Sequence, residues 1–189
     1  TDFLSRARAA GHAVPDANFR RALSNLQNRL NAATDAQYAD QYEAASMAYA
    51  AYVLARERAA VVSDLRYYAD TGRDSFSTPM AAAQLGAALA FLGDQPRADR
   101  MFGHAQTLLA DNADPVGLRR DFGTLLRDRA AVLTLAAEAG SERVDRNRLA
   151  SDMAREIAIR DNGSLSTQEA LWTVLAGQAL VAGSDPGQG

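Results

Sequence analysis

The sequence that comes nearest to a catalytic motif is Ser166-Thr167-Gln168-Glu169, which precedes an apolar helical run. A Ser at the N-cap with a Glu three residues later is a capping box, in which each side chain accepts a hydrogen bond from the other residue's backbone N–H. A nucleophilic Ser would also need a base, and neither His12 nor His104 is close in sequence. The motif therefore predicts the start of a helix.

The two histidines and one charged triplet are the other candidates for chemistry. His12 lies at the predicted end of the first helix, where an imidazole interacts favourably with the helix dipole. His104 lies on a predicted helix without a recognisable partner. Arg127-Asp128-Arg129 also lies within a predicted helix, where ion pairs between helices are favoured over a substrate clamp. His12 and the charged triplet therefore indicate structural roles, and His104 has no assigned role.

The composition excludes several classes of site. The 189 residues include no Cys and two His, and the 20 basic residues are all Arg, against 23 acidic residues. Without Cys there is no disulfide, iron–sulfur cluster, Cys-based zinc site or cysteine nucleophile, and without Lys there is no Gly-x-x-x-x-Gly-Lys phosphate loop. The net charge of −3 does not favour binding to the negatively charged backbone of nucleic acid. We expect no catalytic, cofactor-binding or metal-binding residues, no cofactor and no nucleic-acid partner.

Composition and periodicity predict an all-α fold. Ala, the strongest helix former, occurs 41 times, whereas Val occurs nine times and Ile twice. After a first short helix, helical segments are predicted at 15–30, 37–57, 64–70, 121–138 and 145–160. Three more helices are predicted: one from the Thr78 N-cap to Gly93, one that begins at Asp94 and one that begins at Ser166. The longest uncharged stretches, 78–93 and 170–183, are too short to span a bilayer, so we expect no direct membrane insertion.

Several predicted helices carry an apolar face, and two loops and a tail separate or follow them. Tyr38, Tyr42, Tyr49 and Tyr52 form a stripe that we interpret as a packing surface. The predicted apolar faces also include Phe122 in 121–138, and Leu171 and Trp172 in the last helix. Loops are predicted around Asp111 to Gly117 and at 161–163, and 183–189 is a predicted linker or disordered tail.

Consecutive helices joined by short loops form antiparallel hairpins, which stack as a solenoid or close into an α/α toroid. Leu85, Gly86, Leu89, Ala98, Phe102 and Ala105 match the spacing of a tetratricopeptide hairpin. The 34-residue repeat is not kept, because Arg119 and Arg120 stand 34 positions beyond Leu85 and Gly86. A tetratricopeptide-like interaction module remains the alternative. A toroid glycosidase would need two placed carboxylates and usually aromatic platforms, but the chain has one Trp.

Several runs, taken in order, resemble the bacterial alpha-2-macroglobulin family. They cover nearly the whole chain: 1–4, 6–11, 14–16, 48–56, 64–67, 84–89, 92–94, 125–128 and 165–169. The resemblance implies the later part of the thioester-type helical domain, an α/α toroid in a large, mostly β, multidomain protein. Such proteins act as protease traps, in which cleavage of a bait segment triggers rearrangement and, in many members, a Cys–Gln thioester acylates the attacker. This chain has no Cys, so no thioester residue carries over.

The resemblance sets the remaining expectations. We expect residues 1–182 to be one helical domain, part of a toroid excised from a larger protein, with a non-catalytic, structural role in a broad-spectrum protease inhibitor. Implied partners are target proteases, acting through the full-length parent, neighbouring β domains of the same chain, and peptidoglycan synthases. The implied location is the periplasm, with the parent lipid-anchored at the inner membrane. If the first hairpins of the toroid are missing, apolar faces should be exposed, giving a dimer or a marginally stable monomer.

Overall fold

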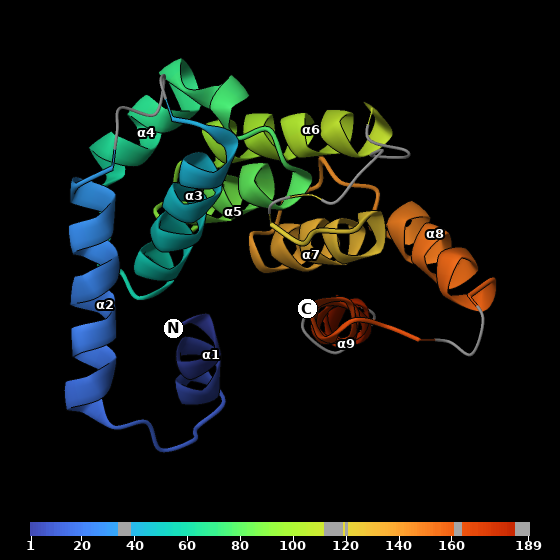
Figure 1. Ribbon diagram of the computed structural model, residues 1–189, viewed down its shortest axis with the longest axis horizontal. Coiled ribbons are helices and arrows are strands. Elements are labelled where there is room, and N and C mark those ends of the chain that lie inside the picture. The colour runs from blue at the N-terminus through green and yellow to red at the C-terminus, as the bar shows by residue number, and fades with distance from the viewer. Residues whose placement is uncertain (34–38, 112–118, 120, 161–163, 184–189) are drawn as a thin grey trace.

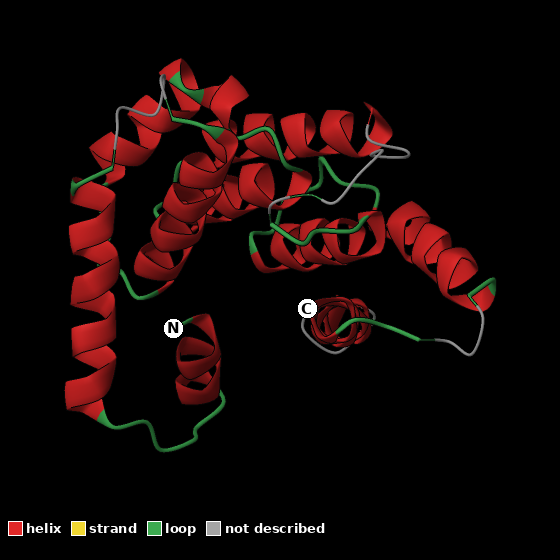
Figure 2. Cartoon of the chain, in the orientation of Figure 1, coloured by secondary structure: helices red, strands yellow, loops and turns green. Residues whose placement is uncertain are grey.

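Figure 1 shows the computed structural model of the protein, in which residues 1–33, 39–111, 119, 121–160 and 164–183 are described. The helices are α1 (Asp2–Ala9), α2 (Asp16–Asn31), α3 (Gln41–Arg56), α4 (Val62–Thr71), a 3₁₀ turn (Arg73–Ser75), α5 (Pro79–Phe91), α6 (Gln95–Asp111), α7 (Leu125–Glu138), α8 (Arg146–Ala158) and α9 (Thr167–Gly183). These ranges contain no strand (Figure 2). The predicted all-α class is confirmed.

Side-chain caps place many of the helix ends. Thr78, Thr124 and Asp145 each accept a hydrogen bond from the backbone N–H three residues later, at the starts of α5, α7 and α8. Asp94 accepts from the Arg97 N–H in the same way before α6. Gly93 has a φ of +82°, which suits the tight turn between α5 and α6. The caps predicted at Thr78 and Asp94 are confirmed.

The helices form an inner row and an outer row. The helices α3, α5, α7 and α9 pack side by side in succession, and α1 contacts α3. The helices α2, α4, α6 and α8 lie outside them, each packed against an inner neighbour (Figure 1). The helix α5 is apolar all round and buried over most of its length, as a helix surrounded by others should be. Antiparallel hairpins thus build part of an α/α toroid.

The hairpin of α5 and α6 is closely packed at Gly86. A Cβ atom added there would lie 3.2 Å from the backbone oxygen of Ala98 and 3.2 Å from the ring of Phe102. Ala98 and Phe102 are fully buried. The small residue therefore allows the two helices to approach, as the tetratricopeptide-like spacing predicts for this single hairpin.

Three predicted helix starts are wrong, and two of the errors have a local cause. The helix α7 begins at Leu125 rather than Asp121, because Thr124 is its N-cap and Phe122 has a φ of +52°. The helix α3 begins at Gln41 because Asp40 caps it, and 37–38 lie outside the described residues. The helix α4 begins at Val62, two residues before the predicted start.

Phe122 and Leu171, which the sequence places on apolar helix faces, are exposed. Phe122 is 77% exposed because it precedes α7 instead of lying on its apolar face. Leu171 is 55% exposed because α9 buries Glu169, Trp172 and Ala176, and Leu171 lies to one side of that face.

The predicted loops fall largely outside the described residues. The stretch 112–118, the turn 161–163 and the residues 184–189 of the predicted tail are not among them, nor is Tyr38 of the tyrosine stripe. Gly183, which the prediction assigned to the tail, is the last residue of α9. None of the described helices combines the length and apolarity that crossing a bilayer requires.

Candidate functional site

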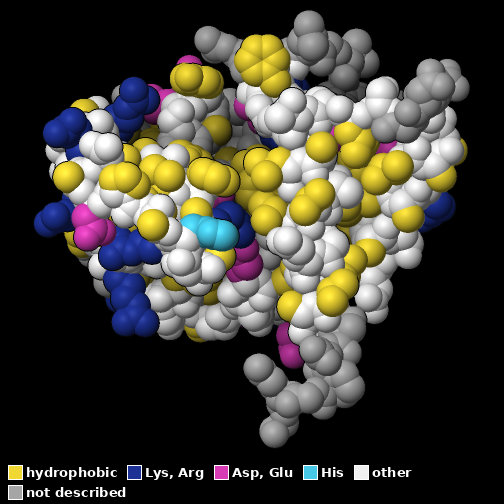
Figure 3. All heavy atoms as spheres, turned by 90° about the horizontal axis from the view of Figure 1, so that it is seen from below, with side chains coloured by type: hydrophobic (Ala, Val, Ile, Leu, Met, Phe, Trp, Pro, Cys, Tyr) yellow, Lys and Arg dark blue, Asp and Glu magenta, His cyan; other side chains and the backbone are white. Residues whose placement is uncertain are grey.

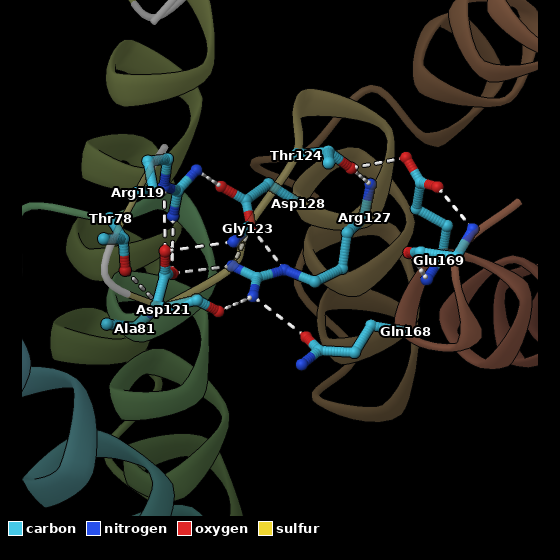
Figure 4. A network of polar contacts seen from close by, with 11 residues as sticks. Thr78, Ala81, Arg119, Asp121, Gly123, Thr124, Arg127, Asp128, Gln168 and Glu169 are labelled. Atoms are coloured by element: carbon cyan, nitrogen blue, oxygen red, sulfur yellow. Dashed lines mark hydrogen bonds and ion pairs between the residues drawn. The ribbon is translucent and has the colours of Figure 1, made fainter. Parts of the chain in front are cut away.

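A cluster of paired charges lies at the N-terminal end of α7 (Figure 4). We call Arg119, Asp121, Arg127 and Asp128 the Arg127 network. Arg127 Nη2 lies 2.8 Å from Asp121 Oδ2 and 2.7 Å from Asp128 Oδ1, and Arg119 Nη1 lies 2.5 Å from Asp128 Oδ2. The Asp128 side chain is 1% exposed, so its charge is balanced by arginines within the protein rather than by water.

The loop before α7 folds around the Arg127 side chain. Arg127 Nη1 donates to the Asp121 carbonyl oxygen at 3.0 Å, and the Gly123 N–H donates to Asp121 Oδ1 at 3.1 Å. A Cβ atom at Gly123 would collide with the guanidinium groups of Arg127 and Arg119. A larger residue at this position would therefore have to displace the guanidinium groups of the network.

The predicted capping box is present and does more than begin a helix. The Ser166 N–H donates to Glu169 Oε2 at 2.8 Å, and the Glu169 N–H donates to Ser166 Oγ at 3.3 Å. The other carboxylate oxygen of Glu169 accepts from Thr124 Oγ1 at 2.7 Å and from Arg160 Nη2 at 2.9 Å. Glu169 thus joins the starts of α7 and α9 to the end of α8, a link that local sequence gives no sign of.

The charged triplet pairs with neighbouring helices, as predicted. Arg127 Nη1 donates to Gln168 Oε1 of α9 at 3.1 Å. Arg129 Nη1 lies 2.7 Å from Glu156 Oε2 of α8. Both contacts fix helices that follow α7 in the chain.

A second cluster joins α1, α3 and α7 at their C-terminal ends. We call Arg6, Tyr52, Arg56 and Glu138 the Tyr52 network. Tyr52 Oη accepts from Arg6 Nη2 at 2.7 Å and donates to Glu138 Oε2 at 3.0 Å. Arg6 Nη1 and Arg56 Nη1 lie 2.5 and 3.1 Å from the Glu138 carboxylate. Sequence reasoning missed this cluster because Arg6 and Glu138 are 132 positions apart.

The tyrosine stripe is a packing surface in part. Tyr52 is fully buried, and burial together with the negative charges of Asp2 and Glu138 raises the pKa of its hydroxyl. Tyr49 Oη accepts hydrogen bonds from the Thr1 amino group at 3.3 Å and the Asp2 N–H at 3.2 Å. Tyr42, at the start of α3, is 58% exposed.

Neither histidine takes part in these clusters. His12 is exposed after α1, and its backbone N–H donates to the Ala7 carbonyl at 2.9 Å. His104 lies on α6, and burial together with the charge of Arg73 lowers the pKa of its imidazole. Within the described ranges, no group of three His, Asp or Glu side chains is placed to hold a metal ion.

The electrostatics of the carboxylates suit a structural role. Burial alone would raise the pKa of Glu169, but hydrogen bonds from Arg160, the Ser166 N–H and Thr124 outweigh it and lower the pKa to about 2. At Asp121 burial also acts to raise the pKa, but hydrogen bonds from Arg127 and Arg119 hold it below its usual value. Both groups stay ionised at neutral pH, so neither is a proton donor, and their contacts fix the starts of α7 and α9.

No family model matches the chain. Curated relatives do: alpha-2-macroglobulins of Xylella fastidiosa, strains Temecula1 and 9a5c, are each 30% identical over 186 residues. The match covers 95% of this chain and 11% of each relative. The chain therefore spans only a small part of the length of the proteins it resembles.

Solved structures agree with the sequence match. A crystal structure of Salmonella alpha-2-macroglobulin reacted with methylamine has a TM-score of 0.79 at 29% identity, covering 94% of this chain and 12% of that one. Escherichia coli alpha-2-macroglobulin activated by porcine elastase has a TM-score of 0.74 at 29% identity over 98% of this chain and 16% of that one. A crystal structure of native E. coli alpha-2-macroglobulin from domain MG7 to the C-terminus has a TM-score of 0.72 at 28% identity, covering 95% of this chain and 28% of that one. The chain is thus homologous to a helical segment of the bacterial alpha-2-macroglobulins, as its sequence resemblance predicts.

Proposed function

We propose that the chain is a non-catalytic, structural segment of a bacterial alpha-2-macroglobulin-like protease inhibitor. The observation that carries the proposal is the match over 98% of the chain to an E. coli alpha-2-macroglobulin that was activated by porcine elastase. In this proposal, cleavage of a bait segment in the parent triggers the rearrangement that traps the protease. The segment contributes helices to the toroid and a surface for neighbouring β domains.

The two polar networks support a structural rather than a chemical role. Their carboxylates are paired with arginines, and their contacts join α1, α3, α7 and α9. The Arg129–Glu156 and Arg160–Glu169 pairs add α8. Such pairs cost much stability when one partner is removed, so they favour one arrangement of the helices. A segment held in this way can move as a unit when the rest of the parent rearranges. The similar proteins give no support to the tetratricopeptide-like alternative.

The proposal extends to the setting of the parent. We propose a periplasmic protein, lipid-anchored at the inner membrane, whose partners are target proteases, its own β domains and peptidoglycan synthases. The Salmonella relative was reacted with methylamine, a small amine that attacks thioesters. This favours a thioester in the parent, upstream of the present chain, since the chain itself has no Cys.

The test uses the intact parent and a general protease, with and without methylamine pretreatment. We expect cleavage of the parent and a denaturant-resistant adduct on a gel, which methylamine abolishes. Residual protease activity on a protein substrate should fall as the adduct forms. Cleavage of the parent with neither an adduct nor any loss of protease activity would contradict the proposed function. Inhibition without an adduct would support the inhibitor function but contradict a thioester in the parent.

The contribution of this segment is tested in the same assay. Trp172→Ala, in the buried face of α9, should weaken inhibition by the parent because it loosens α9 against α7. Arg148→Ala, at an exposed position of α8 with no ion pair to any described residue, is the matched control and should leave inhibition unchanged. If Trp172→Ala inhibits as well as the natural parent, the packing of α9 against α7 does not contribute to inhibition.

A further inference from the structure

The outward face of α2 is basic, although the chain as a whole carries more acidic than basic residues. Residues 1–33 contain five Arg and two Asp, whereas the rest of the chain contains 15 Arg and 21 acidic residues. Phe19 and Leu30 of α2 are buried toward α3, and the exposed arginines lie on the opposite side of the helix. Dark-blue side chains gather at the left of Figure 3, the side on which α2 lies in Figure 1. We call Arg20, Arg21 and Arg29 the α2 arginine face.

The arginines of this face have no partner within the described part of the chain. None of the three forms an ion pair or a side-chain hydrogen bond there. Most of the other described arginines do pair with a carboxylate. Asp16, the one acidic residue of α2, lies 3.7 Å from Arg8 of α1. The three positive charges of the face therefore repel one another and attract an anionic group.

A second group of arginines without ion pairs to described residues lies at the start of α8, but its charge is balanced locally. Glu142 and Asp145 lie among Arg143, Arg146 and Arg148 in the sequence. Charges of both signs at such short spacing largely cancel beyond the Debye length of about 10 Å. No acidic residue lies between the arginines of the α2 arginine face, so its positive charge persists at a distance.

The length and chemistry of the face fit an acidic stretch of polypeptide. The nine residues from Arg20 to Arg29 advance about 14 Å along a helix, which an extended chain covers in about four residues. Guanidinium groups pair with carboxylates through two parallel hydrogen bonds. Asn25 and Asn28 are exposed on the same side of α2, and their amides can bind the backbone of such a stretch.

Other anionic partners fit the face less well. No large hydrophobic side chain of α2 is exposed, so the helix has nothing apolar to insert into a bilayer. Interfaces between parts of a protein that stay together are more apolar than this face. A charged and polar face instead suits a contact that forms quickly and dissociates, which favours a separate protein over a fixed neighbouring domain.

We propose that the α2 arginine face is the docking site for an acidic stretch of a separate protein. Carboxylates of the partner pair with Arg20, Arg21 and Arg29, which lack carboxylates of their own among the described residues. The contact is electrostatic and exposed, so it weakens as salt rises. It depends only on the charges of α2 and goes beyond the proposed inhibitor function, so the two proposals can fail separately.

Binding of a fluorescein-labelled oligoglutamate peptide to the full chain tests the proposal by fluorescence anisotropy. The α2 triple variant combines Arg20→Gln, Arg21→Gln and Arg29→Gln. The matched control, the α8 triple variant, combines Arg143→Gln, Arg146→Gln and Arg148→Gln. Each variant removes three positive charges, and Gln is a good helix former, so circular dichroism should show the natural helix content in both.

We expect the α2 triple variant to bind the peptide about tenfold more weakly than the natural chain, because each exposed charge pair contributes a factor of about two. The α8 triple variant should bind within about twofold of the natural chain. Raising the salt from about 50 to about 200 mM should weaken binding of the natural chain severalfold. Lys at the three α2 positions keeps the charge and should retain most of the affinity.

Four results would overturn the proposal. Absence of binding by the natural chain at low salt would show that the face does not recognise carboxylates. Equal losses in the two triple variants would show that only the net charge matters. Tighter binding to vesicles of anionic phospholipid, lost in the α2 triple variant, would show that a membrane is the occupant. Weaker peptide binding by the intact parent than by the present chain would show that another part of the parent covers the face.

Discussion

Arg160 and Glu169 form an ion pair of 2.9 Å that joins the end of α8 to the first turn of α9. The carboxylate of Glu169 also accepts from Thr124, the N-cap of α7, so three helices meet at one group. Glu169 is only 3% exposed. A buried carboxylate with several donors of this kind is costly to disturb, because its partners are left without an acceptor.

Glu169→Gln should lower the free energy of unfolding by about 2 kcal/mol, because the charge that Arg160 faces is lost while the shape is kept. Urea unfolding at pH 7 measures the change. Glu142→Gln, at an exposed position that forms no ion pair within the described part of the chain, is the control and should change stability by less than about 0.5 kcal/mol. Equal effects of the two substitutions would contradict the central place given to Glu169.

The same group predicts an acid dependence of stability. Its folded-state pKa of about 2 lies below the usual 4.5, so the unfolded chain binds a proton more readily than the folded one. The stabilisation is therefore complete above pH 4.5 and is lost as the pH falls toward 2. Unfolding midpoints measured from pH 6 down to about 2 should fall less steeply for Glu169→Gln than for the natural chain. Parallel curves would rule out Glu169 as a source of the dependence.

The sequence predicts the helices better than it predicts what joins them. Caps such as Thr78 and the Ser166–Glu169 box act within four residues, so local pattern is sufficient to find them. The sequence places Phe122 on the apolar face of α7 because apolar residues at helical spacing also occur before the Thr124 cap. A 3.6-residue pattern does not detect a cap. The Tyr52 network brings residues 6, 52 and 138 together, and only the packing of inner helices decides that they meet.

Arg6 and Arg8 lie on the same short helix, α1, but differ in the burial of their ion pairs. Arg6 contacts Glu138 and Tyr52 in a partly buried cluster, whereas the Arg8–Asp16 pair is exposed and 3.7 Å long. Arg6→Gln should cost about 2 kcal/mol, since Glu138 and Tyr52 each lose one of their charged donors and keep only Arg56. Arg8→Gln should cost less than about 1 kcal/mol. Chemical unfolding of both variants checks this. A larger loss for Arg8→Gln would mean that α1 is held by its exposed face.

Gly86 and Gly103 give opposite predictions for the same substitution in a helix. Gly103→Ala should stabilise the protein by up to about 1 kcal/mol, because Ala favours helix and nothing lies within 4 Å of the new Cβ. Gly86→Ala should destabilise it by about 1 kcal/mol or more, because the Cβ would press on the Ala98 backbone and the buried Phe102 ring. Thermal melts compare the two variants. A higher melting temperature for Gly86→Ala would show that α5 and α6 can separate without cost.

The outer face of α9 should make the isolated chain self-associate. Leu171, Val174 and Val181 are 55%, 61% and 73% exposed, and the one charged residue of the helix, Glu169, is buried. Hydrophobic side chains also gather on the face seen from below in Figure 3, the side on which α1 and α9 lie in Figure 1. An apolar surface without charge favours contact with another copy when no parent domain covers it.

We therefore expect the isolated chain to bind a hydrophobic dye and to form dimers that sedimentation velocity detects as concentration rises. Leu171→Gln combined with Val174→Gln should reduce both effects severalfold. Val61→Gln is the control, because Val61 is 51% exposed but precedes α4, on the opposite side of the molecule from α9 in Figure 1. A natural chain that stays monomeric and binds no dye would contradict the prediction, because its exposed α9 face would then need no partner.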